Sequence, residues 1–448
     1  MGRIIASKNP SRLTVLLAAS FPLAYLVGLI AFSGYSDQSS LTLESLLAAT
    51  SACVAWLMIA MMAMDSPKPG MRLLTRLLEK GPIIEIAGVA IIFGLWVVVA
   101  LTMMPWNDEL SNIEASRYLF QHGFKAYFNN YTEVNDWLGP HHPPFLPLVY
   151  AGIYSVFGAK IIVGRLFGCL CALGACCLAY LWIKRQAGRR MALVACALCL
   201  SYPLVWFNGA SSILDPPFWL IFTACLLLFD RYMESRKALD GLWCGLCIGV
   251  AVLSRYNGFL LPPIFLILML CASRGRRALK QIGTWLVLIG PALILLPWFA
   301  YAAWTGSLWI QAQKLGSFVL VMVIPDGGFF YVRNFLAPLI PFMVGLWNIP
   351  LWVSGFFNIA RNDRDMANLR LALVGIIYVA FVLITLPNPR YLLAVAPSLA
   401  ILPAVKVLEA EDKEGRGLEL LIFLLGLSLI HVALVLHQTS LGEVYFFY

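Results

Sequence analysis

Charged residues are scarce in this chain. Asp, Glu, Lys and Arg make up 12% of its 448 residues, apolar residues make up 61%, and the mean hydropathy is +0.82. Soluble globular domains carry about 25% charged and roughly 45–50% apolar residues. The composition therefore excludes an ordinary soluble protein and predicts a polytopic membrane protein.

The sequence also lacks the alternation of apolar and polar residues that transmembrane β-strands require. Its apolar runs are continuous, rich in Leu, Ala and Gly, and long enough to cross about 30 Å of hydrocarbon as helices. We predict an all-α bundle of about 13 transmembrane helices. The expected spans are residues 13–32, 44–64, 83–104, 160–183, 191–208, 216–233, 241–254, 257–272, 281–303, 335–357, 371–386, 391–408 and 419–437.

Cysteine is absent from the segments between the expected spans. All eleven cysteines fall inside spans, which argues against a disulfide framework. Cys244 and Cys247 form a CxxC pair, but in an apolar, Gly-rich run we interpret them as small packing residues. The chain shows no internal repeat and no soluble domain.

Basic residues are distributed unevenly. With a cytoplasmic N-terminus, 24 of the 32 Lys and Arg residues fall in the inner segments, as expected for the cytoplasmic side. The first apolar run is too long for a signal peptide, so we expect it to be a span. Anionic membrane lipids beside the inner segments account for the net charge of +9 without a nucleic-acid partner. We expect an integral protein of a bacterial inner membrane.

The longest polar stretch near the start of the chain, residues 105–144, follows the third expected span. It begins with the acidic pair Asp108-Glu109 and ends with His141-His142. Residues 114–122 are expected to be helical, and the apolar segment 145–157 is too short to span, so we place it in the membrane interface. Carboxylates at a membrane boundary indicate a functional site on the outer face.

Several motifs, in order, carry a family resemblance. Trp106-Asn107-Asp108-Glu109, His141-His142-Pro143-Pro144 and Val163-Gly164-Arg165-Leu166 resemble the first outer loop of GT-C glycosyltransferases, in particular the protein O-mannosyltransferase and ArnT-like (lipid A aminoarabinose transferase) group. Leu214-Asp215-Pro216-Pro217-Phe218, Gly249 to Phe259 and Asn388-Pro389-Arg390-Tyr391-Leu392-Leu393 are similar to later motifs of that group. The resemblance covers roughly residues 83–408. It departs from the group's pattern in having two preceding spans and in having Arg255 where Lys is common.

The resemblance implies a GT-C bundle that moves a sugar from a polyprenyl-phosphate donor to a hydroxyl of a lipid, glycan or protein. We expect residues 1–82 to form a two-span hairpin and an amphipathic cytoplasmic linker. Residues 83–408 would form the catalytic core, with a first outer loop at 105–159 and an outer lid loop at 304–334. Residues 409–448 would form a last span and a short outer tail.

The expected chemistry needs one base and a set of phosphate-binding cations. The base takes the acceptor's proton, and the leaving phosphate needs no strong acid, so a single in-line displacement with inversion suffices. Asp108 is the expected base, and Glu109 would orient the acceptor, the sugar or a metal. If the reaction uses a Mg²⁺ or Mn²⁺ ion, Asp108, Glu109 and Asp215 are its candidate ligands.

Cations at membrane-boundary depth are the expected donor site, because guanidinium groups can bind phosphate bidentately. The candidate donor-binding residues are Arg165, Arg255, Tyr256, Arg390, Tyr391, His141, His142 and Asp215.

Each candidate also has an interpretation that involves no substrate. Asp108 and Glu109 could be helix N-terminal charges, and the arginines could be snorkelling span ends. His141 and His142 could be surface residues, and Asp215 could be a helix N-cap before Pro216. A transporter or flippase, or a membrane scaffold, is the alternative class, although the ionisable residues gather at one face rather than at the midplane.

Overall fold

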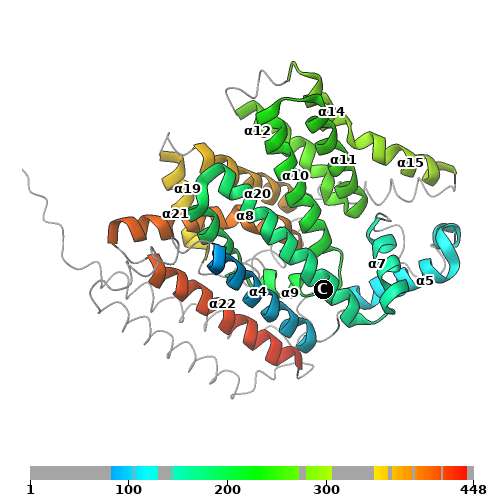
Figure 1. Ribbon diagram of the computed structural model, residues 1–448, viewed down its shortest axis with the longest axis horizontal. Helices are drawn as coiled ribbons and strands as arrows, with labels where there is room; N and C mark the ends of the chain where they lie inside the picture. Colours follow the sequence, from blue (N-terminus) through cyan, green and yellow to red (C-terminus); the bar gives the residue numbers. More distant parts are fainter. Residues whose placement is uncertain are drawn as a thin grey trace, which may run out of the picture.

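The computed structural model describes residues 82–103, 105, 107–129, 143, 145–271, 279–304, 348–361, 366–385, 389–414 and 417–440. Within these residues all regular structure is helical (Figure 1). The expected two-span hairpin and linker at 1–81, His141, His142 and the expected lid loop lie outside the described residues, apart from the first residue of that loop, Trp304, which ends a helix.

The helices follow the predicted apolar runs. They are α4 (Pro82–Thr102), α5 (Asn107–Asn129), α7 (Phe145–Phe157), α8 (Ile161–Cys199), α9 (Pro203–Gly209), α10 (Asp215–Ser235), α11 (Ala238–Ser254), η1 (Tyr256–Leu260), α12 (Leu261–Cys271), α14 (Ile282–Ile289), α15 (Pro291–Trp304), α19 (Ile349–Arg361), α20 (Met366–Thr385), η4 (Pro389–Val395), α21 (Ala396–Glu414) and α22 (Gly417–Ser440).

Three helical stretches among the described residues are long and apolar enough to cross a membrane: 161–199, 282–304 and 390–412. Six shorter apolar helices accompany them. The first stretch covers the expected span 160–183 and the first part of the span 191–208, which separate at Gly188, where φ is 86° and ψ is 170°. A positive φ is inexpensive for glycine because it has no Cβ, so the chain turns there, within the basic segment expected between these spans.

Two of the boundaries that differ from the prediction bear on the site. The expected span 191–208 is broken: α8 ends at Cys199, and α9 begins at Pro203 after an extended Tyr202. Proline lacks an N–H and disfavours helical backbone at the preceding residue, so the helix cannot continue through it. The helix expected at 114–122 begins at Asn107 instead, which puts the acidic pair Asp108-Glu109 in its first turn, where the helix dipole favours negative charge.

Helix α8 is the central element and packs against α10, α4 and α21 (Figure 1). The glycine at position 168 brings it close to the loop before α10, because a Cβ there would lie 2.1 Å from the carbonyl oxygen of Ser211. Helices α5 and α7 pack against each other and extend to one side of the bundle, where Leu119 and Ala151 share a small apolar cluster with Trp298 of α15. This arrangement places the first turn of α5 beside α8 and the start of α10.

Candidate active site

Asp108 and Arg390 form an ion pair between the first turn of α5 and η4. Both side chains are partly buried, and the carboxylate keeps 34% of its accessible surface. Arg390 follows Pro389, whose ring fixes the backbone at the start of η4. Residues from opposite ends of the expected core therefore meet at one point.

Asp215 and Arg255 form a second ion pair, which is buried. Asp215 is the first residue of α10, and Arg255 sits in extended backbone between α11 and η1. The interpretation of Asp215 as an N-cap is wrong, because Leu214 occupies that position. Oδ2 of Asp215 is buried and has no hydrogen-bond partner within the described part of the chain.

The ring of Tyr391 connects the two ion pairs. Cζ of Arg255 lies 4.7 Å from the ring centroid, and Cζ of Arg390 lies 5.8 Å from it. Both distances are in the range of cation–π attraction, so the two guanidinium groups share one aromatic ring. Asp108, Asp215, Arg255, Arg390 and Tyr391 thus form one cluster, which we call the charged cluster.

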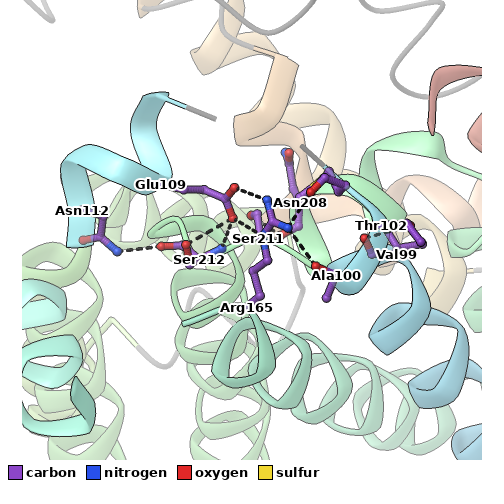
Figure 2. Close-up of polar contacts among 10 residues, drawn as sticks. Val99, Ala100, Thr102, Glu109, Asn112, Arg165, Asn208, Ser211 and Ser212 are labelled. Carbon is purple, nitrogen blue, oxygen red and sulfur yellow. Dashed lines mark hydrogen bonds and ion pairs between the residues drawn. The ribbon is translucent and has the colours of Figure 1, made fainter. Parts of the chain in front are cut away.

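Glu109 belongs to a different network, which is fully buried (Figure 2). Nε and Nη2 of Arg165 donate to its two carboxylate oxygens, at 3.0 and 2.7 Å. The backbone N–H and hydroxyl of Ser212 also donate to Glu109, at 2.7 and 3.2 Å. Both oxygens of Glu109 therefore have protein partners.

Arg165 joins this network to the end of α4. Its Nη1 donates to the carbonyl oxygens of Ala100 and Met103, at 2.8 and 2.7 Å (Figure 2). These carbonyls lie in the last turn of α4 and just after it, where intrahelical donors run out. All three guanidinium nitrogens of Arg165 are used in this way, and the network holds α4, α5, α8 and the loop before α10 together.

Asn112 completes the attachment of α5, because its Nδ2 donates to the carbonyl oxygen of Ser212 at 2.6 Å (Figure 2). Asn112, one turn after Asp108, and Ser212 were not predicted as site residues. The only signal in the sequence was that Ser211-Ser212 lie just before the motif Leu214 to Phe218, separated from it by Ile213. Tyr154 lies in the same region; burial, followed by the nearby Glu109 carboxylate, raises the pKa of its hydroxyl well above the usual value, so the hydroxyl stays protonated.

Two further polar residues border the charged cluster. Nδ2 of Asn257 donates to the hydroxyl of Tyr378 at 3.4 Å, and this hydroxyl lies within electrostatic range of Arg255 and Asp215. Neither residue was predicted, because single Asn and Tyr residues in apolar runs carry no distinctive pattern. Tyr256, a candidate donor-binding residue, starts η1 beside Arg255 and is half-buried.

No group of three or more His, Cys, Asp and Glu side chains in the described ranges is arranged to hold a metal ion. Asp108 and Glu109, though adjacent in sequence, point into different networks. The expectation of a Mg²⁺ or Mn²⁺ site remains a prediction.

The fold and the charged cluster define a polytopic helical membrane protein with its ionisable residues gathered between α5, the starts of α10 and η4, and the end of α11. Comparison with known proteins narrows this class. Residues 141–301 match the family described as dolichyl-phosphate-mannose-protein mannosyltransferase. The chain is 27% identical over 371 residues to the undecaprenyl phosphate-alpha-4-amino-4-deoxy-L-arabinose arabinosyl transferase of Edwardsiella ictaluri; the match covers 75% of this chain and 62% of that protein.

Two solved structures share the fold. ArnT from Cupriavidus metallidurans bound to undecaprenyl phosphate superposes with a TM-score of 0.58 at 17% identity, covering 81% of this chain and 78% of that one. The oligosaccharyltransferase AglB from Archaeoglobus fulgidus, in complex with an inhibitory peptide and a dolichol-phosphate, has a TM-score of 0.50 at 16% identity, covering 80% and 56%. The chain therefore shares the fold of these membrane glycosyltransferases, and it spans less than two thirds of the length of its curated relative from Edwardsiella.

Proposed function

We propose that this protein transfers a monosaccharide from a polyprenyl-phosphate donor to a hydroxyl group of a lipid, glycan or protein acceptor. The observation that carries the proposal is the charged cluster, in which the partly accessible carboxylate of Asp108 pairs with Arg390 and a second arginine, Arg255, shares the ring of Tyr391. The lipid phosphates named with the ArnT and AglB structures support a lipid-phosphate donor. With a cytoplasmic N-terminus, the cluster faces the periplasm or the lumen.

Asp108 is the proposed general base. It takes the proton of the acceptor hydroxyl while the hydroxyl oxygen attacks the anomeric carbon and the bond from that carbon to the phosphate oxygen breaks. The electron pair of that bond leaves with the phosphate, and a single displacement of this kind inverts the anomeric centre. Asp108 suits this role better than its neighbour, since its side chain is 34% exposed, whereas that of Glu109 is fully buried with both oxygens hydrogen-bonded.

Arg390 and Arg255 are the proposed phosphate ligands. A phosphate that enters beside Tyr391 meets both guanidinium groups and offsets their charge as the carboxylates do in the free protein. Preorganised cations of this kind stabilise the negative charge that grows on the leaving group. Arg390 would turn from Asp108 to the phosphate, which releases the base for the acceptor.

Glu109 and Arg165 receive a supporting role in this proposal. Each already has its polar atoms bound to protein groups, so we assign them to fixing the first turn of α5, which carries Asp108. This replaces the substrate contacts that the sequence suggested for these two residues. Positioning of this kind matters because a displacement of about 1 Å at a reacting group can cost 10²-fold in rate.

The test is transfer activity of the purified protein in lipid nanodiscs, with a panel of polyprenyl-phosphate sugars and hydroxyl acceptors. The Asp108→Asn variant is nearly isosteric but cannot accept the proton, so its rate should fall by about 10²–10⁴. Its thermal unfolding should match the wild type. Asp412→Asn is the matched control, because Asp412 forms an exposed ion pair with Arg190.

Activity of Asp108→Asn within a few-fold of the wild type would remove Asp108 from the role of base. If Asp108→Asn fails to fold, its loss of activity says nothing about the base. The test is then Asp108→Glu, which keeps the carboxylate and should retain part of the rate. Vectorial movement of an intact substrate without transfer would replace the proposal by the transporter alternative.

A further inference from the structure

A second polar pocket lies at the far end of α10 from the charged cluster. It lies between α8, α10, α12 and α20 and has about 30 Å³ of room for the centres of water-sized groups; among its lining residues are Trp182, Gln186, Phe229, Asp230, Leu268 and Arg370. Asp215 begins α10 and Asp230 lies near its other end, so at 1.5 Å per residue they are roughly 22 Å apart along the helix. With the charged cluster at one surface of a hydrocarbon core about 30 Å thick, we infer that this pocket lies toward the headgroups of the opposite leaflet.

The wall of the pocket presents two hydrogen-bond acceptors side by side. Nε2 of Gln186 donates to Oδ2 of Asp230, which joins the turn region of α8 to α10. Oε1 of the same glutamine is buried and has no hydrogen-bond partner among the residues that the structure describes. A buried acceptor without a donor destabilises the protein, so this wall is suited to a ligand with several N–H groups.

A positive charge also lines the pocket. Arg370, near the start of α20, lines the pocket, is exposed, and is within electrostatic range of the Asp230 carboxylate. The rest of the lining includes Trp182, Phe229 and Leu268, which are apolar over most of their surface. The pocket therefore offers a negative site, a positive site and an apolar wall.

We propose that this pocket binds an amine-bearing phospholipid, phosphatidylethanolamine, from the leaflet opposite the charged cluster. The ammonium group donates to Asp230 and to Oε1 of Gln186, the phosphate pairs with Arg370, and an acyl chain lies against Phe229 and Leu268. A choline headgroup has no N–H to give the two acceptors, and a glycerol headgroup has no cation for Asp230. The ammonium group supplies the hydrogen-bond donor that Oε1 of Gln186 lacks. The lipid itself comes from the surrounding bilayer.

Binding has a structural consequence, because the lipid contacts α8, α10 and α20 together. A ligand that binds only the folded protein raises its stability by mass action. Since α10 also carries Asp215, the lipid would stabilise one of the helices that build the charged cluster. This inference does not depend on the proposed transferase activity and is tested without it.

The experiment measures retained lipid by native mass spectrometry, and thermal unfolding, for the full-length purified protein exchanged into phosphatidylcholine nanodiscs. Phosphatidylethanolamine, its N-monomethyl and N,N-dimethyl derivatives, phosphatidylglycerol and soluble O-phosphoethanolamine are then added separately. We expect retention to fall with each methyl group, at least tenfold between phosphatidylethanolamine and phosphatidylcholine. O-phosphoethanolamine should bind weakly, because it has no acyl chain.

Three variants locate the binding. Asp230→Asn and Gln186→Met should each abolish the preference for phosphatidylethanolamine over phosphatidylcholine, and Arg370→Gln should lower retention of both. Asp412→Asn, whose exposed ion pair with Arg190 lies outside the lining, should behave as the wild type.

Equal retention of all the phosphatidylethanolamine derivatives by the wild-type protein would overturn the proposal, whatever the variants do. A preference for phosphatidylglycerol would overturn it as well, since it would mean that Arg370 binds anionic lipid without any contribution from Asp230 and Gln186. If O-phosphoethanolamine binds as tightly as the lipid, the proposed lipid ligand is wrong and the pocket binds a soluble amine.

Discussion

At the residue scale, the three arginines expected to bind phosphate differ in how they are engaged. Arg165 is enclosed by Glu109 and the carbonyls at the end of α4, whereas Arg255 and Arg390 each face a carboxylate and share the ring of Tyr391. Binding a phosphate at Arg165 would break a buried carboxylate pair and two hydrogen bonds to backbone carbonyls, so we expect Arg255 and Arg390 to exchange a carboxylate for a phosphate more readily. The donor site is therefore expected at Arg255 and Arg390.

Replacement of Arg390 tests this assignment. Arg390→Lys keeps the charge but loses the planar fork that matches two phosphate oxygens, so KM for the donor should rise with little change for the acceptor. Arg390→Ala should be worse, because it removes charge that balances the leaving phosphate. The double variant with Arg255→Ala should lose less than the sum of the single losses, as expected for residues acting on one group.

Initial rates against donor concentration measure these effects, with thermal unfolding followed in parallel. Losses of rate that are strictly additive, or that are explained by unfolding, would mean that both arginines are structural residues. The donor would then bind elsewhere.

Glu109 should behave differently from its neighbour Asp108. Glu109→Gln leaves Arg165 buried without its countercharge, and breaking a buried pair in this way costs about 3–5 kcal/mol. We expect a clearly lower unfolding temperature for Glu109→Gln and an unchanged one for Asp108→Asn. Glu109→Gln with wild-type stability but no activity would instead favour a direct substrate contact.

At the element scale, the position of the site depends on how closely α8 approaches the loop before α10. Gly168 permits this approach, since a Cβ there would lie 2.1 Å from the carbonyl oxygen of Ser211, beside the Ser212 that holds Glu109. The network in Figure 2 is therefore built on a backbone contact, and its geometry is sensitive to side-chain volume on α8.

Gly168→Ala should push the loop away from α8 and lower the free energy of unfolding by about 1–3 kcal/mol through overpacking. It should also lower activity, because the displaced loop carries the Ser212 that holds Glu109. Gly174→Ala is the matched control on the same helix, because its Cβ would meet only the flexible end of Leu220, at 3.0 Å. The measurements are the thermal unfolding and the transfer rate of the two variants, and both should fall more for Gly168→Ala than for Gly174→Ala. Equal effects would mean that the helix itself, rather than the contact with Ser211, is sensitive to alanine.

At the scale of the whole molecule, the bundle places the charged cluster at one end of α10 and the basic residues around Asp230 at the other. This is the arrangement expected of a transferase that works at one membrane face, and it is consistent with the predicted cytoplasmic N-terminus. The alternating access of a transporter would instead place ionisable residues near the midplane.

Labelling with a membrane-impermeant maleimide tests this orientation. A cysteine at the exposed Gln121, in α5, should react in intact spheroplasts, and one at the exposed Glu234, at the end of α10, should react only in inverted vesicles. The exposed native Cys177 and Cys271 are replaced by Ser for this measurement. Labelling of both positions from the same side would contradict the predicted topology.

The sequence by itself determined the helical membrane bundle and most of the helices in it, because apolar run length is a local property of the chain. It also singled out Asp108, Asp215, Arg255, Arg390 and Tyr391, since polar residues that interrupt apolar runs are conspicuous. It placed the breaks at Arg255 and near Pro389 correctly, but it missed the one before Pro203 in the run 191–208.

Only the tertiary structure decided which residues pair. Asp108 lies beside Glu109 in the chain, yet the first turn of α5 directs one carboxylate to Arg390 and the other to Arg165. The partners are far apart in sequence, and their meeting depends on how α5, α8, α10 and η4 pack. Ser212 and Asn112 were missed for the same reason: their role comes from a backbone contact across the bundle, and such a contact leaves no pattern in the sequence.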